Sequence, residues 1–202
     1  MIDLSSIINL ARDLNLIEQV RWKLVRQNEP AAAKLAEVLD ELAKMVGALD
    51  AEIVRYLSLS FNPETVVAGR AVLLGLEAGQ SMVRMGEARG HCHKIANIYE
   101  KYLKRWFHDV LDPGEAQQID WLFGNLSTAD SMMLGAMDGV TRWLRDEAQQ
   151  TLDMVDLDNF SGANQRIRDA RMLVRDARVQ LTEAMGSLRA MQAEFIAVAR
   201  AV

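Results

Sequence analysis

The C-terminal segment 167–202 carries an apolar residue at alternating intervals of three and four positions. The repeat consists of Ile167, Ala170, Val174, Ala177, Leu181, Ala184, Leu188, Met191, Phe195, Val198 and Val202. This alternation places the apolar side chains on one face of an α-helix, and sustained heptads are typical of helices that pack lengthwise against other helices. The sequence therefore predicts a long final helix that begins near Ala163 and a fold that supplies helical partners for it.

Composition and proline positions indicate that the rest of the chain is helical too. Half of the 202 residues are hydrophobic, and the only prolines are Pro30, Pro63 and Pro113. Because proline disrupts the interior of a helix, these positions separate the predicted helices. Apolar spacing predicts them over 2–27, 31–58, 64–110, 115–124 and 128–155. We therefore predict an all-α fold in a single domain, residues 1–202: an elongated antiparallel bundle of five or six helices with coiled-coil-like seams.

The predicted helix 64–110 contains a cluster of glycines. Gly75 and Gly79 are four residues apart, as are Gly86 and Gly90. Each glycine in a helix interior costs up to about 1 kcal/mol relative to alanine, so we expect this helix to bend or break once. Their regular spacing favours a face that lets a neighbouring helix approach closely over a flexible hinge.

The charges are distributed unevenly along the chain, which has a net charge of −5. Segment 112–165 has two basic and ten acidic residues, whereas segment 166–202 has seven basic and four acidic residues. Segment 64–111 is also weakly basic, with seven basic and five acidic residues. We interpret this pattern as helices of opposite charge that pack together within the chain. The alternative is that the acidic segment forms a docking face for a basic partner.

Three features bear on the location of the protein. The first residues are interrupted by charged side chains and lack the continuous apolar stretch of a signal peptide. No run of about eighteen uncharged apolar residues is present, which disfavours a membrane-spanning helix. Cys92 is the only cysteine, so no internal disulfide can form. These observations favour a cytoplasmic protein.

Few residues suggest catalytic or metal chemistry. The candidates are His91, Cys92, His93 and the pair His108-Asp109. A His-Asp pair resembles the HD-type phosphohydrolases, but His91 and His93 are two residues apart and diverge around a helix. The spacing of Arg84 and His91 resembles that of HEPN-type ribonucleases, although chance produces such a pair in a chain rich in arginine. The sequence also lacks a paired Glu-x-x-His motif and a glycine-lysine phosphate loop. We therefore predict a non-enzymatic protein with no catalytic residues, no metal site and no cofactor.

Basic and aromatic residues alternate in segment 94–108. Tyr99, Tyr102 and Trp106 fall on one arc of a helical wheel, with the basic residues Lys94, Lys101 and Arg105 beside them. Such a face suits a membrane surface or an anionic partner, because aromatic rings favour the interface and basic groups bind anions. The favoured interpretation is nevertheless that the rings belong to the core and the basic groups face the acidic segment. The negative net charge disfavours nucleic acid as the partner.

The first sixty residues resemble one known group of helical bundles. The apolar residues Met1, Leu4, Ile7, Ile8 and Leu10 are followed by an amphipathic run from Leu35 to Leu57. This spacing is similar to the N-terminal bundles of cell-death executioners, namely the HeLo-like domains and the bundle of the mixed-lineage kinase domain-like pseudokinase. The resemblance implies a bundle that oligomerises and perturbs membranes once a regulatory domain releases it.

Two functional hypotheses follow. The favoured one is an interaction module, a scaffold or regulatory subunit that binds another protein or a second copy of itself. Its predicted surface is the apolar end of the last helix, namely Leu188, Met191, Phe195, Val198 and Val202, because this end exceeds what a small bundle needs. The alternative is a membrane-active effector that uses residues 2–16 and 94–108.

Overall fold

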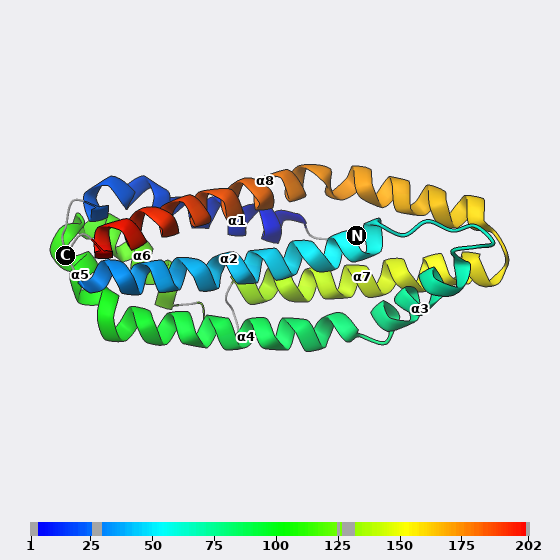
Figure 1. The fold of residues 1–202 in the computed structure, drawn as a ribbon, viewed down its shortest axis with the longest axis horizontal. Helices are drawn as coiled ribbons and strands as arrows, with labels where there is room; N and C mark the ends of the chain where they lie inside the picture. Colours follow the sequence, from blue (N-terminus) through cyan, green and yellow to red (C-terminus); the bar gives the residue numbers. More distant parts are fainter. Residues whose placement is uncertain (1–3, 26–29, 125, 127–131, 201–202) are drawn as a thin grey trace.

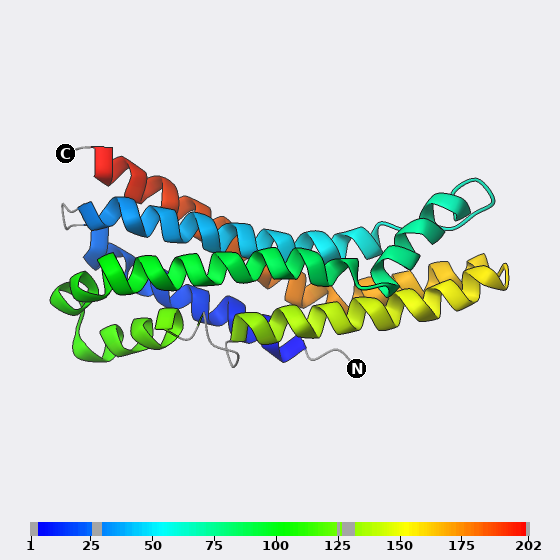
Figure 2. The same ribbon diagram turned by 90° about the horizontal axis from the view of Figure 1, so that it is seen from below.

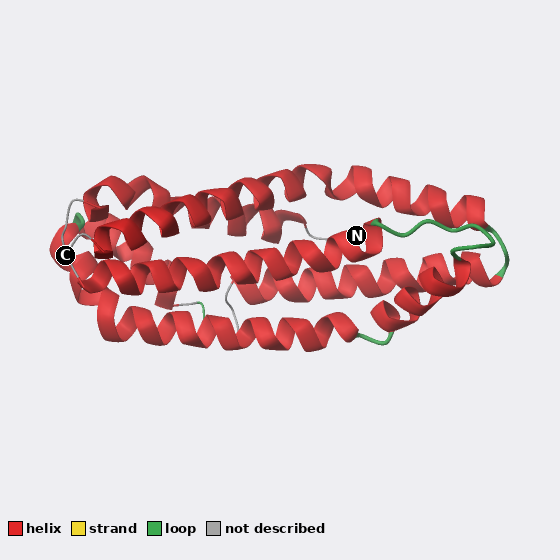
Figure 3. Ribbon diagram, in the orientation of Figure 1, coloured by secondary structure: helices red, strands yellow, loops and turns green. Residues whose placement is uncertain are grey.

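The computed structural model describes residues 4–25, 30–124, 126 and 132–200, with side chains at all of these positions except 4–11, 84, 85, 88, 132 and 133. The elements are α1 (Leu4–Val25), α2 (Pro30–Leu57), α3 (Val66–Glu77), α4 (Gln80–Ile98), the π-helical turn η1 (Tyr99–Leu103), α5 (Lys104–Val110), α6 (Pro113–Gly124), α7 (Met132–Asp156) and α8 (Phe160–Arg200). The described residues contain no strand, and the prediction of an all-α protein is confirmed. Figure 3 shows helices joined by short connections.

The long helices lie side by side along the long axis of the molecule. In Figure 1, α8 and α2 extend over most of its length, α4 runs beside α2, and α7 lies behind α2. The short helices α5 and α6 gather at the end where α2 begins and α8 ends, which the rotated view confirms. Helix α3 packs mainly against α7, at the opposite end. The buried apolar residues of all these helices form one core.

Helices α2 and α8 form the most extensive contact in the molecule and run in opposite directions. Their polar contacts follow this reversal. Gln192 Nε2 donates to Asp40 Oδ1 at 3.2 Å, Arg178 Nε to Asp50 Oδ1 at 2.7 Å, and Arg171 Nε to the Leu57 carbonyl at 2.9 Å. Between these contacts lie the two predicted apolar stripes. The fully buried stripe of α2 consists of Leu35, Val38, Leu42, Met45, Leu49, Ile53 and Tyr56.

The stripe of α8 is also buried, and this corrects the predicted interaction surface. Leu188, Met191 and Phe195 belong to the core, and Val198 is partly buried against it. Val202 lies outside the described residues. The reason is that α1 covers this end of α8, as the contact between Arg21 Nη1 and Glu194 Oε2 at 3.3 Å and a hydrogen bond from Ser187 to Glu18 show. Leu188, Met191 and Phe195 are therefore packed inside the bundle.

The glycine cluster of segment 64–110 is the site of a helix break. Gly79 separates α3 from α4 and adopts a left-handed conformation with φ of 80°, which a side chain would disfavour. Gly86 and Gly90 lie in exposed positions on α4, and a Cβ atom added at either would meet nothing within 4 Å. The prediction that these glycines admit a closely packed helix is therefore wrong. The expected break within this segment is found at Gly79. Because the segment contains α3, α4, η1 and α5, the described count of eight α-helices exceeds five or six.

We expect replacement of Gly90 with alanine to stabilise the protein by about 0.5–1 kcal/mol, because alanine loses less backbone entropy in a helix. Thermal unfolding followed by circular dichroism would show a raised Tm. The matched variant Gly79→Ala should lower Tm, since the positive φ at that position is unfavourable for alanine. A lowered Tm for Gly90→Ala would contradict the open environment of this glycine.

Among the helices that the structure describes, none has both the length and the apolar character needed to cross a membrane.

Candidate functional site

The histidines predicted as chemical candidates lie in separate places. His91 on α4 contacts Glu41 on α2 through Nδ1, and His108 on α5 contacts Asp120 on α6 at 2.7 Å through Nε2. The two histidines are seventeen positions apart on a nearly continuous helical stretch, which corresponds to roughly 25 Å at about 1.5 Å per residue. His93 is exposed. They therefore do not share one pocket.

The other chemical candidates give no site either. Cys92 is buried against Met45, and this burial raises the pKa of its thiol to about 11, which makes it a poor nucleophile. The described residues contain no group of three or more His, Cys, Asp and Glu side chains that could hold a metal ion. The side chain of Arg84, the partner of His91 in the HEPN-like spacing, lies outside the described side chains.

A tyrosine, an aspartate and a histidine form a small network where η1, α5 and α6 meet. The Tyr99 hydroxyl donates to Oδ1 of Asp120, whose Oδ2 contacts His108. Burial would raise the pKa of Asp120, but the hydrogen bonds from Tyr99 and His108 outweigh it and lower that pKa. Burial also raises the pKa of Tyr99. Asp120 thus stays ionised and ties α6 to the π-helical turn.

The predicted membrane or anionic-partner face is divided between core and surface. Tyr99 and Trp106 are buried, and Tyr99 stacks against Phe107 and Phe123. This burial removes both rings from the candidate face and agrees with the interpretation that they belong to the core. It arises because α6 covers them at this end of the bundle.

The remaining members of that face are polar and lie outside the core. Lys94 Nζ pairs with Glu41 Oε1 at 2.9 Å and with Glu37 Oε1 at 3.2 Å. Lys101, Tyr102 and Arg105 are exposed. The Tyr102 ring lies beneath two ammonium groups, those of Lys34 and Lys101, at 5.2 and 5.1 Å from its centroid. These residues do not join the buried rings in one continuous amphipathic face.

A polar seam joins α2 to α4. Its centre is Glu41, only 4% exposed, which accepts hydrogen bonds from Lys94 at 2.9 Å, from Lys44 at 3.3 Å and from His91. Burial alone would raise the pKa of Glu41, but the hydrogen bonds lower it to about 2. Further along, Ser81 donates to the buried Glu52 at 2.7 Å beside a groove of about 550 Å³. The seam holds α4 against α2 with paired charges.

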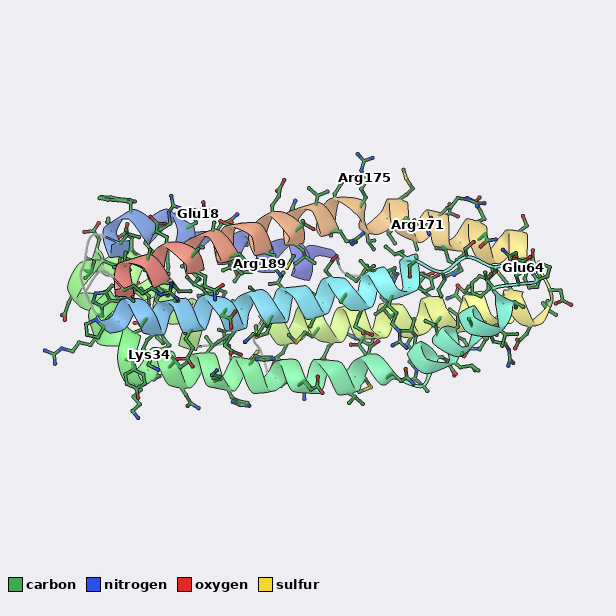
Figure 4. The ribbon with its side chains drawn as sticks, viewed as in Figure 1. Glu18, Lys34, Glu64, Arg171, Arg175 and Arg189 are labelled. Carbon is green, nitrogen blue, oxygen red and sulfur yellow. The ribbon has the colours of Figure 1, made fainter. Side chains whose placement is uncertain are left out.

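A second groove, of about 490 Å³, lies on the outer side of α8; we call it the α8 groove and define it by Leu57, Arg171, Met172, Arg175, Arg178 and Val179. Arg171 caps the last carbonyl of α2, that of Leu57, and Arg178 pairs with Asp50. Met172 and Val179 are 70% and 49% exposed. In Figure 4, Arg171 turns toward α2, whereas Arg175 extends away from the bundle.

No family model, curated protein or solved structure matches this chain. The function must therefore be inferred from the surface of the bundle. The α8 groove is a stronger candidate than the histidines because it combines exposed apolar groups with an arginine that has no polar partner among the described residues.

Sequence reasoning missed the α8 groove, although a signal for it exists. Met172, Arg175 and Val179 are spaced by three and four residues, so they share one helical face. This face is distinct from the buried repeat. An apolar pair on the outer face of a helix that already has a complete buried stripe indicates a second contact surface.

Proposed function

We propose that the protein is a cytoplasmic, non-enzymatic interaction module. Its elongated antiparallel bundle, with coiled-coil-like seams, presents the α8 groove to an amphipathic helix of another protein. One observation carries the proposal: Met172 and Val179 are exposed on either side of Arg175, which has no polar partner among the described residues. An apolar pair two helical turns apart is the pattern that a helix-in-groove contact uses.

Charge identifies the kind of partner. The α8 groove contains three guanidinium groups and one carboxylate, that of Glu183. An acidic side chain on the incoming helix can pair with Arg175, while its apolar side chains cover Met172 and Val179. In a symmetric dimer across this groove, like charges would face each other. Charge therefore favours an acidic amphipathic helix over a second copy of this chain.

Site-specific photo-crosslinking in the native host tests this proposal. A benzophenone side chain at position 179 should capture one defined protein through an acidic helical segment, whereas the same probe at Leu157, which is 80% exposed, should not. With that segment as a purified peptide, Arg175→Glu should weaken binding about tenfold, because an attractive charge pair becomes repulsive. Reversing the acidic residue of the peptide to lysine should restore binding to the variant.

Three outcomes would overturn the proposal: equal labelling from both positions, capture of a second copy of the chain, or unchanged peptide affinity for Arg175→Glu. Light scattering on the wild-type protein reveals self-association independently. Arg175→Glu should unfold like the wild type, since Arg175 extends into solvent, so a loss of binding would not reflect unfolding.

The alternative, a membrane-active effector, has less support in this conformation. It needs the aromatic residues of segment 94–108 at a surface, and both Tyr99 and Trp106 lie in the core. Its N-terminal segment, residues 2–16, lies largely outside the described side chains. Co-sedimentation with anionic vesicles at low salt would favour this alternative over the interaction module.

A further inference from the structure

A third groove lies between α4 and α7 and has a volume of about 570 Å³; we call it the α4–α7 groove. Gly79, Met82, Gly86 and Arg89 line it from one face of α4. Gly86 leaves this side open, because a Cβ atom there would meet nothing within 4 Å. The volume falls in the range of about 300–1,000 Å³ that small-molecule sites occupy.

The opposite wall carries an unusual concentration of positive charge. Segment 112–165 contains ten acidic residues and only two basic ones, Arg142 and Arg145, and both line this groove. Arg89 adds a third guanidinium from α4. The only carboxylate among the lining residues is that of Asp138. The groove therefore has an excess of positive charge on the most acidic segment of the chain.

These arginines are weakly engaged within the protein. Arg89 Nη2 lies 3.7 Å from Asp138 Oδ1, and both side chains are more than half exposed, so this pair is weak. Arg142 donates through Nε to the Asp138 carbonyl at 3.3 Å, and its other N–H groups have no partner among the described residues. Arg145 has no polar partner among the described residues.

A second observation points to a ligand. Thr141, which also lines the groove, has a hydroxyl oxygen that is buried and has no hydrogen-bond partner among the described residues. A buried hydroxyl without a partner costs stability. The hydroxyl is covered in this conformation, so Thr141 must change rotamer to present it to the groove. A ligand oxygen bound between the arginines would then supply that partner.

We propose that the α4–α7 groove binds the phosphate group of a small organic phosphate. Guanidinium groups bind phosphate oxygens through paired N–H donors, and Thr141 adds a hydroxyl donor. Met82, which is 63% exposed, supplies adaptable apolar surface for the organic part of the ligand. Asp138 opposes binding, because its carboxylate competes for Arg89.

Calorimetric titration with phenyl phosphate and with inorganic phosphate, at constant ionic strength, tests the proposal. The wild type should bind phenyl phosphate more tightly than inorganic phosphate, because the ring contacts the exposed side chain of Met82. Arg142→Gln combined with Arg145→Gln should weaken phenyl phosphate at least tenfold. The matched control, Lys101→Gln with Arg105→Gln, removes the same charge from an exposed region elsewhere and should change affinity less than twofold.

Two single variants sharpen the test. Asp138→Asn should tighten binding several-fold, because it frees Arg89 from a competing carboxylate. Thr141→Val should weaken binding while raising the Tm of the unliganded protein, since it removes a buried hydroxyl without a partner. Equal effects of the groove variants and the control pair on affinity would overturn the proposal. So would the absence of any binding both to phenyl phosphate at millimolar concentration and to vesicles that contain phosphatidic acid.

Binding to phosphatidylcholine vesicles with and without phosphatidic acid distinguishes a lipid headgroup from a soluble ligand as the source of the phosphate group. Binding that requires phosphatidic acid and is lost with Arg142→Gln/Arg145→Gln identifies a lipid headgroup. Binding of phenyl phosphate without vesicle binding identifies a soluble ligand. Both results support the same phosphate site, and neither depends on the α8 groove.

Discussion

Replacing Phe195 with alanine should destabilise the protein by about 3–5 kcal/mol, the range observed when a large aromatic side chain is removed from a packed core. Phe195 is among the largest fully buried side chains and lies near the end of α8, where α1 covers the helix. Equilibrium unfolding in urea, followed by circular dichroism, measures the loss.

The matched control is Met172→Ala on the same helix. Because Met172 is 70% exposed, its removal should change the free energy of unfolding by no more than about 0.5 kcal/mol. If Phe195→Ala were as stable as the wild type but showed an altered mass in light scattering, the core position of Phe195 would be contradicted. The result would support the predicted interaction surface at the end of α8. A chain truncated after Leu188 would not distinguish a core position from an assembly surface, because it loses both Met191 and Phe195.

Apolar periodicity predicted the helices well because it records burial directly. The α2 stripe from Leu35 to Tyr56 and the part of the α8 stripe from Ile167 to Ala184 are buried as predicted. Periodicity does not reveal which element covers a stripe. The end of α8 therefore looked unpartnered, although α1, more than a hundred residues earlier in the chain, packs over it.

The charge pattern predicted that acidic and basic segments pair within the chain, but it did not identify which helices pair. Acidic residues of segment 112–165 pair with bases from several elements. Asp112 binds Lys23 of α1 at 2.8 Å, Asp156 binds Arg70 of α3 at 2.8 Å, and Glu147 binds Arg166 of α8 at 2.9 Å. Helix α8 itself lies mainly along α2 and α1, with less contact to α7. Net charge averages over a whole segment, whereas packing depends on one face of each helix.

The α8 groove and the α4–α7 groove could not be predicted from residue spacing alone, because a groove depends on how helices are placed next to each other. The basic pair Arg142 and Arg145 stood out in an acidic segment, but only the structure places Arg89 opposite them. The glycines gave a misleading signal. Their spacing is compatible with close packing, yet Gly79 ends a helix and Gly86 leaves space beside α7.

Replacing Glu41 with glutamine should lower the free energy of unfolding at pH 7 by up to about 3 kcal/mol. The folded pKa of Glu41 is about 2, against 4.5 for an unperturbed glutamate, and each pKa unit corresponds to about 1.4 kcal/mol. Glutamine keeps the size of the side chain but cannot form ion pairs with Lys94 and Lys44. Urea unfolding at pH 7, followed by circular dichroism, measures this difference.

The pH dependence gives the sharper result. Because the folded pKa lies below the unfolded one, the ionised Glu41 stabilises the fold fully above about pH 4.5, and this contribution is lost as the pH falls toward 2. The difference between the wild type and Glu41→Gln should therefore be largest near neutral pH and shrink through that window. Glu64→Gln, an exposed carboxylate at the opposite end of the bundle, is the control and should show little difference at any pH. If the difference in free energy of unfolding between Glu41→Gln and the wild type stayed constant from pH 7 to pH 2.5, the charge of Glu41 would not stabilise the seam. Side-chain packing would then account for the difference.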